Sequence, residues 1–214
     1  MTLLVRSMIG LTLAAALVTG CSSSDTTTDS EQETSGQPTS GTTDSGNETG
    51  SDNRQLEQFN SVEVSTGMAV KLTVASGTQQ SVRVKTPDTF TGTVITKVTD
   101  QVLRISQEDV GVGEGPTVTV AIPQLKSLVV DQGSTITASG NINSYTVKLA
   151  QGSNLSAAAL RAEKVAVDLD QGSNAEIFAA TSVTGSLRSG SNLQVRGDAD
   201  TAQVKVESGS NLSD

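Results

Sequence analysis

The sequence predicts an all-β chain whose C-terminal part is a parallel β-helix, a solenoid with coils of about 19 residues, preceded by a β-rich N-terminal half. A Gly-Ser dipeptide followed by Asn or Thr recurs five times, with its glycines at positions 133, 152, 172, 190 and 209. A fixed period of about 20 residues is typical of a solenoid, in which each repeat forms one coil. Aliphatic residues also recur at fixed distances on both sides of each glycine, and helical periodicity is almost absent.

Residues 1–21 have the features of an export signal. Arg6 supplies a positive charge, and residues 8–18 form an apolar run that is too short for a convincing transmembrane helix. The segment ends with the sequence LVTGC, and Cys21 is the only cysteine of the chain, which excludes an internal disulfide. An ordinary secretory signal with an incidental cysteine is the alternative.

The end of this segment resembles the lipobox of bacterial lipoproteins, in which a small residue precedes a cysteine that is acylated and becomes the first residue of the mature chain. The resemblance implies lipidation of Cys21 and attachment to a membrane through its acyl chains. Stable attachment requires more than one such chain. Ser22 stands where an aspartate would retain a Gram-negative lipoprotein in the inner membrane, so the resemblance implies a cell-envelope protein in the outer membrane.

Residues 22–55 are expected to form a disordered, acidic tether rich in Ser, Thr and Gly. Residues 22–53 carry seven acids and no base, and they include nothing apolar larger than Pro38. Such a segment buries too little surface to offset its chain entropy. A flexible chain of about 32 residues has a root-mean-square span on the order of 30 Å. The tether would therefore lift a domain from a lipid surface while keeping it attached.

The folded domain is expected over residues 56–214, and its first half contains short strands separated by turns. The evidence is apolar alternation at the period of a strand, interrupted by turn residues such as Gly67, Gly77 and Pro87. Strands are expected around residues 62–64, 70–74, 82–84, 93–98, 102–106 and 117–122. The last of these is followed by Pro123, which ends it.

The second half contains five coils, each with apolar residues three and five positions before its glycine and at the same distances after it. These columns have the period of two that places alternate side chains of a strand on one face. Each coil is therefore expected to contain a strand, a corner, a second strand and a return segment. Residues 156–164 have helical propensity, but their place in the repeat favours a strand. The columns are Leu128, Val147, Val167, Gly185 and Val204; Val130, Leu149, Leu169, Leu187 and Val206; Ile136, Leu155, Ala175, Leu193 and Leu212; and Ala138, Ala157, Ile177 and Val195.

The corner phrase Gly-Ser-Asn suits a sharp bend, because glycine and asparagine tolerate positive φ better than other residues. Asn154, Asn174, Asn192 and Asn211 would stack at successive corners, where their amides can form ladders. A structural role for this Ser and Asn column is the simpler interpretation. A ligand-binding strip is the alternative.

Outward positions of the repeats carry charges of both signs, among them Lys148, Asp168, Asp170 and Arg188. Opposite charges on neighbouring strands stabilise a sheet slightly, so this pattern is typical of a solvated face. Any activity is expected on these outward faces. The alternative is that the pairs Asp168/Asp170 and Asp198/Asp200 serve as metal ligands or glycosidase acids, but no other feature of the sequence supports such a role.

Five Gly-Ser corners, the opening sequence FNSVEV at 59–64, and Pro123-Gln124-Leu125 before an apolar strand together resemble a known family. It is the putative auto-transporter adhesin family with the head GIN domain, which is common among bacterial lipoproteins. The resemblance covers roughly residues 59–211 and implies a right-handed parallel β-helix after a β-rich half. The family offers no established catalytic residues to carry over. Thr135 departs from the pattern, since it replaces the corner asparagine of the first coil.

The sequence thus predicts a lipid-anchored envelope protein that is not an enzyme and displays a β-solenoid for adhesion or envelope interaction. The expected ligand is a glycan or an envelope protein. Nucleic acid is not expected as a partner, because the net charge is −9 and the sequence has no basic patch. Two alternatives remain. One is a β-helix enzyme acting on polysaccharide, and the absence of His and Trp from the chain argues against it. The other is a self-assembling structural β-helix that forms homo-oligomers through its open last coil, residues 204–212.

Overall fold

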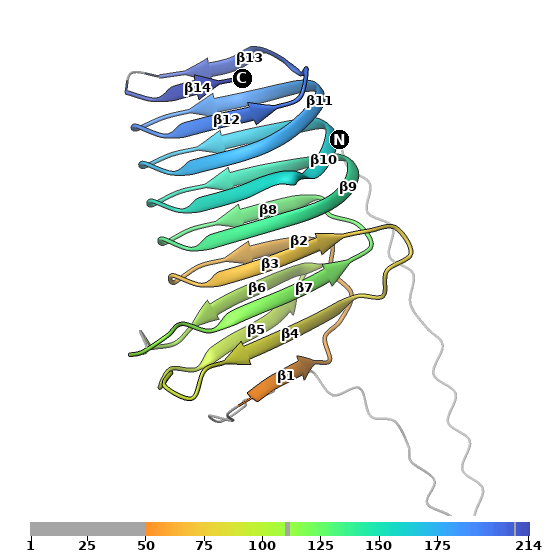
Figure 1. The fold of residues 1–214 in the computed structure, drawn as a ribbon, viewed down its shortest axis with the longest axis vertical. Coiled ribbons are helices and arrows are strands. Elements are labelled where there is room, and N and C mark those ends of the chain that lie inside the picture. The colour runs from red at the N-terminus through yellow and green to blue at the C-terminus, as the bar shows by residue number, and fades with distance from the viewer. Residues whose placement is uncertain (1–49, 110–111, 208) are drawn as a thin grey trace, which may run out of the picture. The chain divides into compact units, whose positions relative to one another are not determined.

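The computed structural model describes residues 50–109, 112–207 and 209–214, which all belong to one compact unit, 40–214. These residues form fourteen strands and no helix (Figure 1), so the all-β prediction is confirmed. The export signal, Cys21 and most of the expected tether lie outside the described residues. The strands are β1 (Gly50–Arg54), β2 (Ser61–Val64), β3 (Ala69–Val74), β4 (Ser81–Thr86), β5 (Val94–Thr99), β6 (Val102–Gln107), β7 (Thr117–Ile122), β8 (Ser127–Val130), β9 (Thr135–Leu149), β10 (Asn154–Leu169), β11 (Asn174–Leu187), β12 (Asn192–Arg196), β13 (Asp200–Val206) and β14 (Asn211–Ser213).

The strands belong to one mixed, mostly parallel sheet that folds back on itself, so that two layers of strands face each other (Figure 1). Strand β9 illustrates the arrangement. Its residues 135–140 pair with β3 in what we call the front layer, and its residues 146–149 pair with β8 in the back layer. Strands β10 and β11 follow β9 in parallel through both layers.

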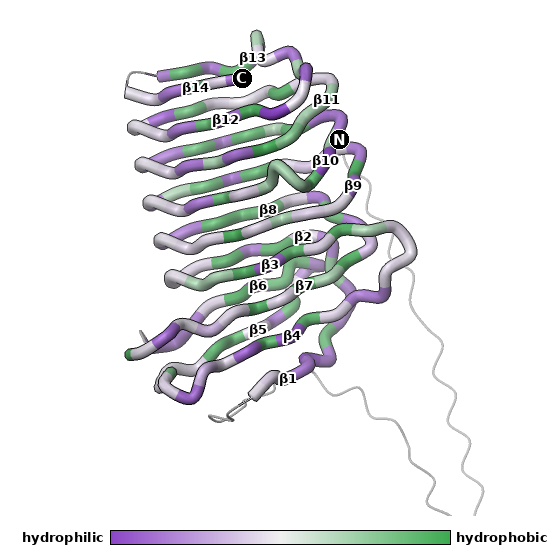
Figure 2. Tube along the Cα trace, viewed as in Figure 1, coloured by the Kyte–Doolittle hydropathy of each residue, from purple (hydrophilic) through white to green (hydrophobic). Residues whose placement is uncertain are grey.

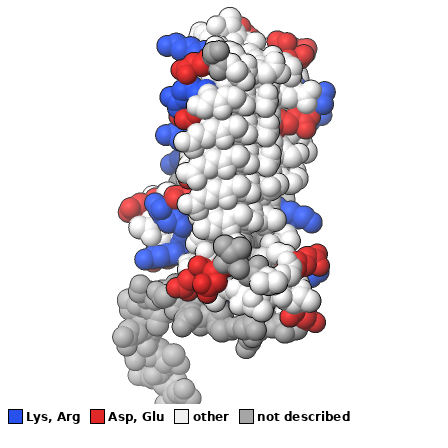
Figure 3. All heavy atoms as spheres, turned by 90° about the vertical axis from the view of Figure 1, so that its left-hand side faces the viewer, with Lys and Arg blue, Asp and Glu red and all other residues white. Residues whose placement is uncertain are grey.

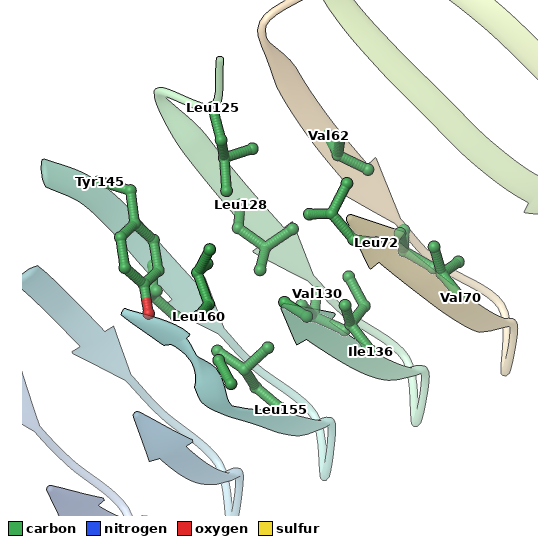
Figure 4. Close-up of a cluster of buried hydrophobic side chains, with 14 of the residues drawn as sticks. Val62, Val70, Leu72, Leu125, Leu128, Val130, Ile136, Tyr145, Leu155 and Leu160 are labelled. Atoms are coloured by element: carbon green, nitrogen blue, oxygen red, sulfur yellow. The ribbon is translucent and has the colours of Figure 1, made fainter. Parts of the chain in front are cut away.

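The apolar columns predicted from the repeat are confirmed by the register of the strands. Leu149 pairs with Val130 on one side and with Leu169 on the other. Leu155 pairs with Ile136 and Ala175 in the same way in the front layer. All six side chains are buried, and apolar residues alternate with polar ones along the strands (Figure 2). The inward side chains of the two layers therefore form one hydrophobic core, part of which Figure 4 shows.

All six strands expected in the first half are present, with ends within two residues of those predicted. The Ala-rich segment 156–164 lies in β10, so register prevails over helical propensity there as expected. Propensity is a weak preference that tertiary context overrides. Within this segment the register between β10 and β11 shifts, between Ala157 and Arg161.

Order begins earlier than the sequence indicates, because β1 lies within the segment expected to be tether. It pairs antiparallel with β4 along its whole length. An edge strand of this kind forms through backbone hydrogen bonds, so it needs no alternating apolar side chains. The sequence GSDNR accordingly carries no strand signal. The expected boundary after residue 55 is wrong for residues 50–54.

Strands β2 and β3 form a further repeat that lacks the Gly-Ser phrase. Val64 pairs with Val130 and Val70 pairs with Ile136, so both strands extend the columns. Between them Thr66 and Gly67 both have positive φ, as at the later corners. Buried Met68 takes the place of the serine. Antiparallel strands β4 and β5 cover this end of the stack by pairing with β7 and β6.

Candidate functional site

The first four corners are tight turns in which two consecutive residues have positive φ. At one of them Gln151 has φ 54° and Gly152 has φ 73°, and the amide of Ser153 donates to the carbonyl of Ala150 over 3.2 Å. Two positive φ angles in a row are characteristic of the mirror-image turns that connect strands tightly. The positive φ of glycine is confirmed, but the expectation for asparagine is wrong. Asn154 already begins β10, and the residue before the glycine bends the chain instead.

The serine of the repeated phrase points into the molecule and closes each turn. Ser153, Ser173 and Ser191 are completely buried. Their Oγ atoms donate to the carbonyls of Ala150 at 2.6 Å, Asp170 at 2.6 Å and Arg188 at 2.7 Å respectively. A buried hydroxyl needs such a partner, because leaving it unsatisfied costs about 1–3 kcal/mol. Sequence reasoning missed this role, although the recurrence of serine in all five corners was the available signal.

Three of the four asparagines form the predicted ladder, whereas the side chain of Asn211 has no hydrogen bond to Asn192 among the described residues. Asn174 donates through Nδ2 to Oδ1 of Asn154 over 3.2 Å, and Asn192 donates to Asn174 over 2.9 Å. The turns are also connected through their backbones, since the amide of Gly152 donates to the carbonyl of Gln171 over 2.9 Å. Hydrogen bonds in two rows therefore connect the corners at Gly152, Gly172 and Gly190.

The stacked corners present an uncharged polar surface, which we call the turn strip. Figure 3 views this edge and shows a band without charged residues, with Lys, Arg, Asp and Glu gathered on both sides. The turn strip consists of the exposed turn residues and the asparagine ladder: Gln132, Gly133, Gln151, Gly152, Gln171, Gly172, Ser189, Gly190, Asn154, Asn174 and Asn192.

A shallow groove of about 400 Å³ lies beside the turn strip on the front layer. The ladder forms one row of its lining, and Ser156, Glu176 and Gln194, which are neighbours in register, form a second row. Glu176 is the one charged residue of the lining, and its Oε1 atom forms an ion pair with Nε of Arg196 at 2.9 Å. We call this hollow the front groove. Its amide and hydroxyl groups suit a polar ligand without strong charge.

The four charged residues singled out from the sequence lie together in a second groove, on the back layer beside the turns. Arg188 forms ion pairs from Nη2 to Oδ1 of Asp168 at 2.7 Å and from Nε to Oδ2 of Asp170 at 4.0 Å. Lys148 is paired with Asp168 in register, but within the described chain it forms no ion pair. Exposed ion pairs of this kind contribute about 0–1 kcal/mol each. The expected face of mixed charge is therefore present, and Arg188 is its centre.

Within this groove, the pKa of Asp170 lies below its ordinary value. A hydrogen bond from the side chain of Ser189 lowers the pKa of Asp170, and the amide of Gln171 and the charge of Arg188 act in the same direction. A glycosidase acid requires a raised pKa. Asp200 accepts a hydrogen bond from the amide of Ala202. Within the described residues, no group of three or more His, Cys, Asp or Glu side chains is arranged to hold a metal ion.

A family model described as "Putative auto-transporter adhesin, head GIN domain" matches residues 58–137 and 127–199, which is more than half of the chain. No curated protein matches the chain. In the part of the chain that the structure covers, no helix is long and apolar enough to cross a membrane.

Fourteen chains of known structure also match. A putative adhesin from Bacteroides fragilis is 12% identical, with 76% of this chain and 95% of that chain covered and a TM-score of 0.40. A putative adhesin from Parabacteroides merdae is 11% identical, with 76% and 94% covered and a TM-score of 0.34. A putative adhesin from Parabacteroides distasonis is 13% identical, with 77% and 96% covered and a TM-score of 0.36.

Proposed function

Because the chain belongs to the putative auto-transporter adhesin family with the head GIN domain, we propose that it is a lipid-anchored envelope protein whose folded domain serves adhesion. In this proposal acyl chains on Cys21 attach the protein to the outer membrane, and the acidic segment that follows is the tether. The stacked repeats form a β-solenoid. Extended surfaces of repeat proteins commonly serve as binding sites.

The turn strip and the front groove are the surface that we assign to adhesion, and the observation that carries this assignment is their preorganisation. Ladders of hydrogen bonds hold Asn154, Asn174 and Asn192, as well as the turn backbone, in place before any ligand arrives. A surface that is already ordered loses little conformational entropy on binding. Amide groups without net charge suit a glycan or a polar protein surface.

Two other functions have less support. An enzyme acting on polysaccharide would need a carboxylic acid with a raised pKa, whereas the pKa of Asp170 is lowered.

Assembly with a second copy is favoured by β13 and β14, each of which has an edge with no partner strand among the described residues. Val206 on β13 is 44% exposed, although the residues in register with it are buried. Concentration-dependent oligomers in light scattering would support assembly.

Adhesion is tested with cells that lack the protein and are complemented with variants. Gln151→Lys and Gln171→Lys together place two charges on the turn strip, and both side chains are exposed. The matched control is Asn143→Lys, an exposed residue of β9 away from the corners. We expect deletion and the strip variant to reduce attachment, while the control attaches normally. Equal attachment by all strains would contradict the proposal.

The anchor is tested separately with Cys21→Ser. This variant removes the thiol that would carry the acyl chain, so the protein is expected in the soluble fraction after cell lysis. If the variant still sediments with membranes in high salt, the lipid anchor is wrong.

A further inference from the structure

A third groove lies on the outer side of the back layer, and we propose that it binds anionic groups of an acidic polysaccharide. This inference extends the proposed adhesive function, and it rests on that function for the source of the ligand. The groove has a volume of about 350 Å³. No carboxylate lines it, although the chain as a whole has a net charge of −9. Its lining residues are Lys126, Ser144, Tyr145, Thr146, Lys164, Val165, Ala166, Ser182 and Thr184.

The register of three parallel strands builds the centre of this groove. Ser144 and Ser182 flank Lys164 on the neighbouring strands β9 and β11. Thr146 and Thr184 flank Ala166 in the same way. Neighbouring strands lie about 4.8 Å apart, so the four hydroxyl groups surround the central strand at close range.

Ala166 is responsible for the hollow. It lies two residues after Lys164 on β10, so both side chains project from the same face of the sheet. Its side chain is a single methyl group between two threonines, which leaves room for a ligand group beside the lysine. The position matters because any longer side chain would fill the groove.

The lysine and hydroxyl side chains of the groove have no partners inside the described chain. Neither Lys126 nor Lys164 forms an ion pair within 4.0 Å, in contrast to Arg188 in the neighbouring groove. The four hydroxyls form no hydrogen bond with any described residue. Three acids lie nearby: Asp200 beside Ser182 in register, Glu163 next to Lys164 in the chain, and Asp168 two residues after Ala166, where it is paired with Arg188. Asp200 already accepts a hydrogen bond from the amide of Ala202.

Two ammonium groups and four hydroxyls can donate hydrogen bonds to a carboxylate, sulfate or phosphate, and such bonds are strong because the acceptor is charged. The groove is open and shallow, so it fits a charged group carried on a long polymer better than a small molecule that must be enclosed. Regular strands hold the donors at fixed spacing. Together these features favour an acidic polysaccharide over a neutral glycan.

The test measures binding of the full-length protein, in detergent, to immobilised dextran sulfate and alginate, with neutral dextran as the reference polymer. We expect binding to both acidic polymers but not to dextran, and we expect it to weaken as salt is raised. Lys164→Gln is expected to weaken binding about tenfold or more, since a hydrogen bond to a charged group contributes roughly 1.5–3 kcal/mol. Ala166→Glu, which fills the hollow with a carboxylate, is expected to abolish it.

Lys97→Gln is the matched control, because Lys97 is exposed on β5 and the same charge is removed away from the groove. Equal weakening by Lys97→Gln and Lys164→Gln would overturn the site. Binding to phosphatidylglycerol vesicles without binding to either acidic polymer would overturn the ligand class. If polymer binding fails while cells still attach through the turn strip, this inference alone is wrong. If polymer binding persists while the deletion strain attaches normally, the proposed adhesive function is wrong.

Discussion

Gly185 lies so close to Val167 on the neighbouring strand that a Cβ atom placed on it would overlap the carbonyl oxygen of Val167. Gly185 also has φ 132°, a backbone conformation that other residues rarely adopt. The one gap in the apolar column 128, 147, 167, 185 and 204 therefore has a structural cause. The chain passes too near its neighbour there for any side chain.

Gly185→Ala is accordingly expected to lower the free energy of unfolding by roughly 3 kcal/mol, through overlap and strained backbone together. The control is Gly115→Ala, at a loop position with open space around the new methyl group and no positive φ. Thermal unfolding followed by circular dichroism measures both variants. Similar melting temperatures for the two would contradict the close approach of β10 and β11.

Tyr145→Phe is expected to raise the free energy of unfolding by about 1 kcal/mol. Tyr145 is 3% exposed, and its hydroxyl has no hydrogen-bond partner among the described residues. Its ring lies among the buried apolar side chains that Figure 4 shows. A buried hydroxyl without a partner costs about 1–3 kcal/mol, and Phe removes it at almost constant volume. Denaturant unfolding at pH 7 gives the measurement, and a loss of stability would show that the hydroxyl has a partner.

Comparison of the natural protein with Tyr145→Phe also gives a prediction for alkaline pH. Burial raises the pKa of Tyr145 above its ordinary value of 10.0, so the folded protein retains the phenolic proton where the unfolded chain loses it. The unfolded state then binds fewer protons, and the stability present below pH 10 is lost as the pH rises above it. The advantage of Tyr145→Phe should therefore grow above pH 10, by at most about 1.4 kcal/mol per pH unit. A constant difference between pH 8 and pH 11 would contradict this.

Ser189→Ala is expected to raise the pKa of Asp170 toward its ordinary value. The hydrogen bond from the Ser189 side chain is the largest cause of the lowered pKa. A lowered pKa means that the contribution of Asp170 to stability is present above its ordinary pKa and is lost as the pH falls through the folded value. Titration of the Asp170 side-chain carbon by NMR measures the shift. An unchanged titration curve would show that Gln171 and Arg188 are sufficient.

Ser173→Ala is expected to destabilise the protein by about 1 kcal/mol, because the carbonyl of Asp170 loses the hydrogen bond from the buried Ser173 hydroxyl. Ser156→Ala is the control, since Ser156 occupies an exposed position on the same strand face as the ladder. Urea unfolding distinguishes the two. Equal stability would mean that the buried serine fills space without closing the turn.

The repeat predicts the core well, because a period of about 19 residues and the two-residue alternation of a strand constrain the same positions. Leu149 and Leu155 could be assigned to the core on either ground, and both are buried. The inward direction of Ser153 could not be foreseen, since a polar residue next to a glycine is expected at the surface. The groove around Lys164 was also missed. Its serine and threonine pairs, at 144 and 146 and at 182 and 184, are separated by a coil with Lys164 and Ala166 at the same places, so no continuous repeat marks them.

The backbone ladder between the corners has a consequence for how such a protein can change. Each corner contacts only the corners before and after it, as the bond from Gly152 to Gln171 illustrates. Duplication or loss of one repeat would therefore shift the molecule's extent by one strand spacing, about 4.8 Å, without disturbing the remaining corners. The length of the stack and its ligand preference can then evolve separately. The number of repeats determines the length, and substitutions at outward positions determine the ligand preference.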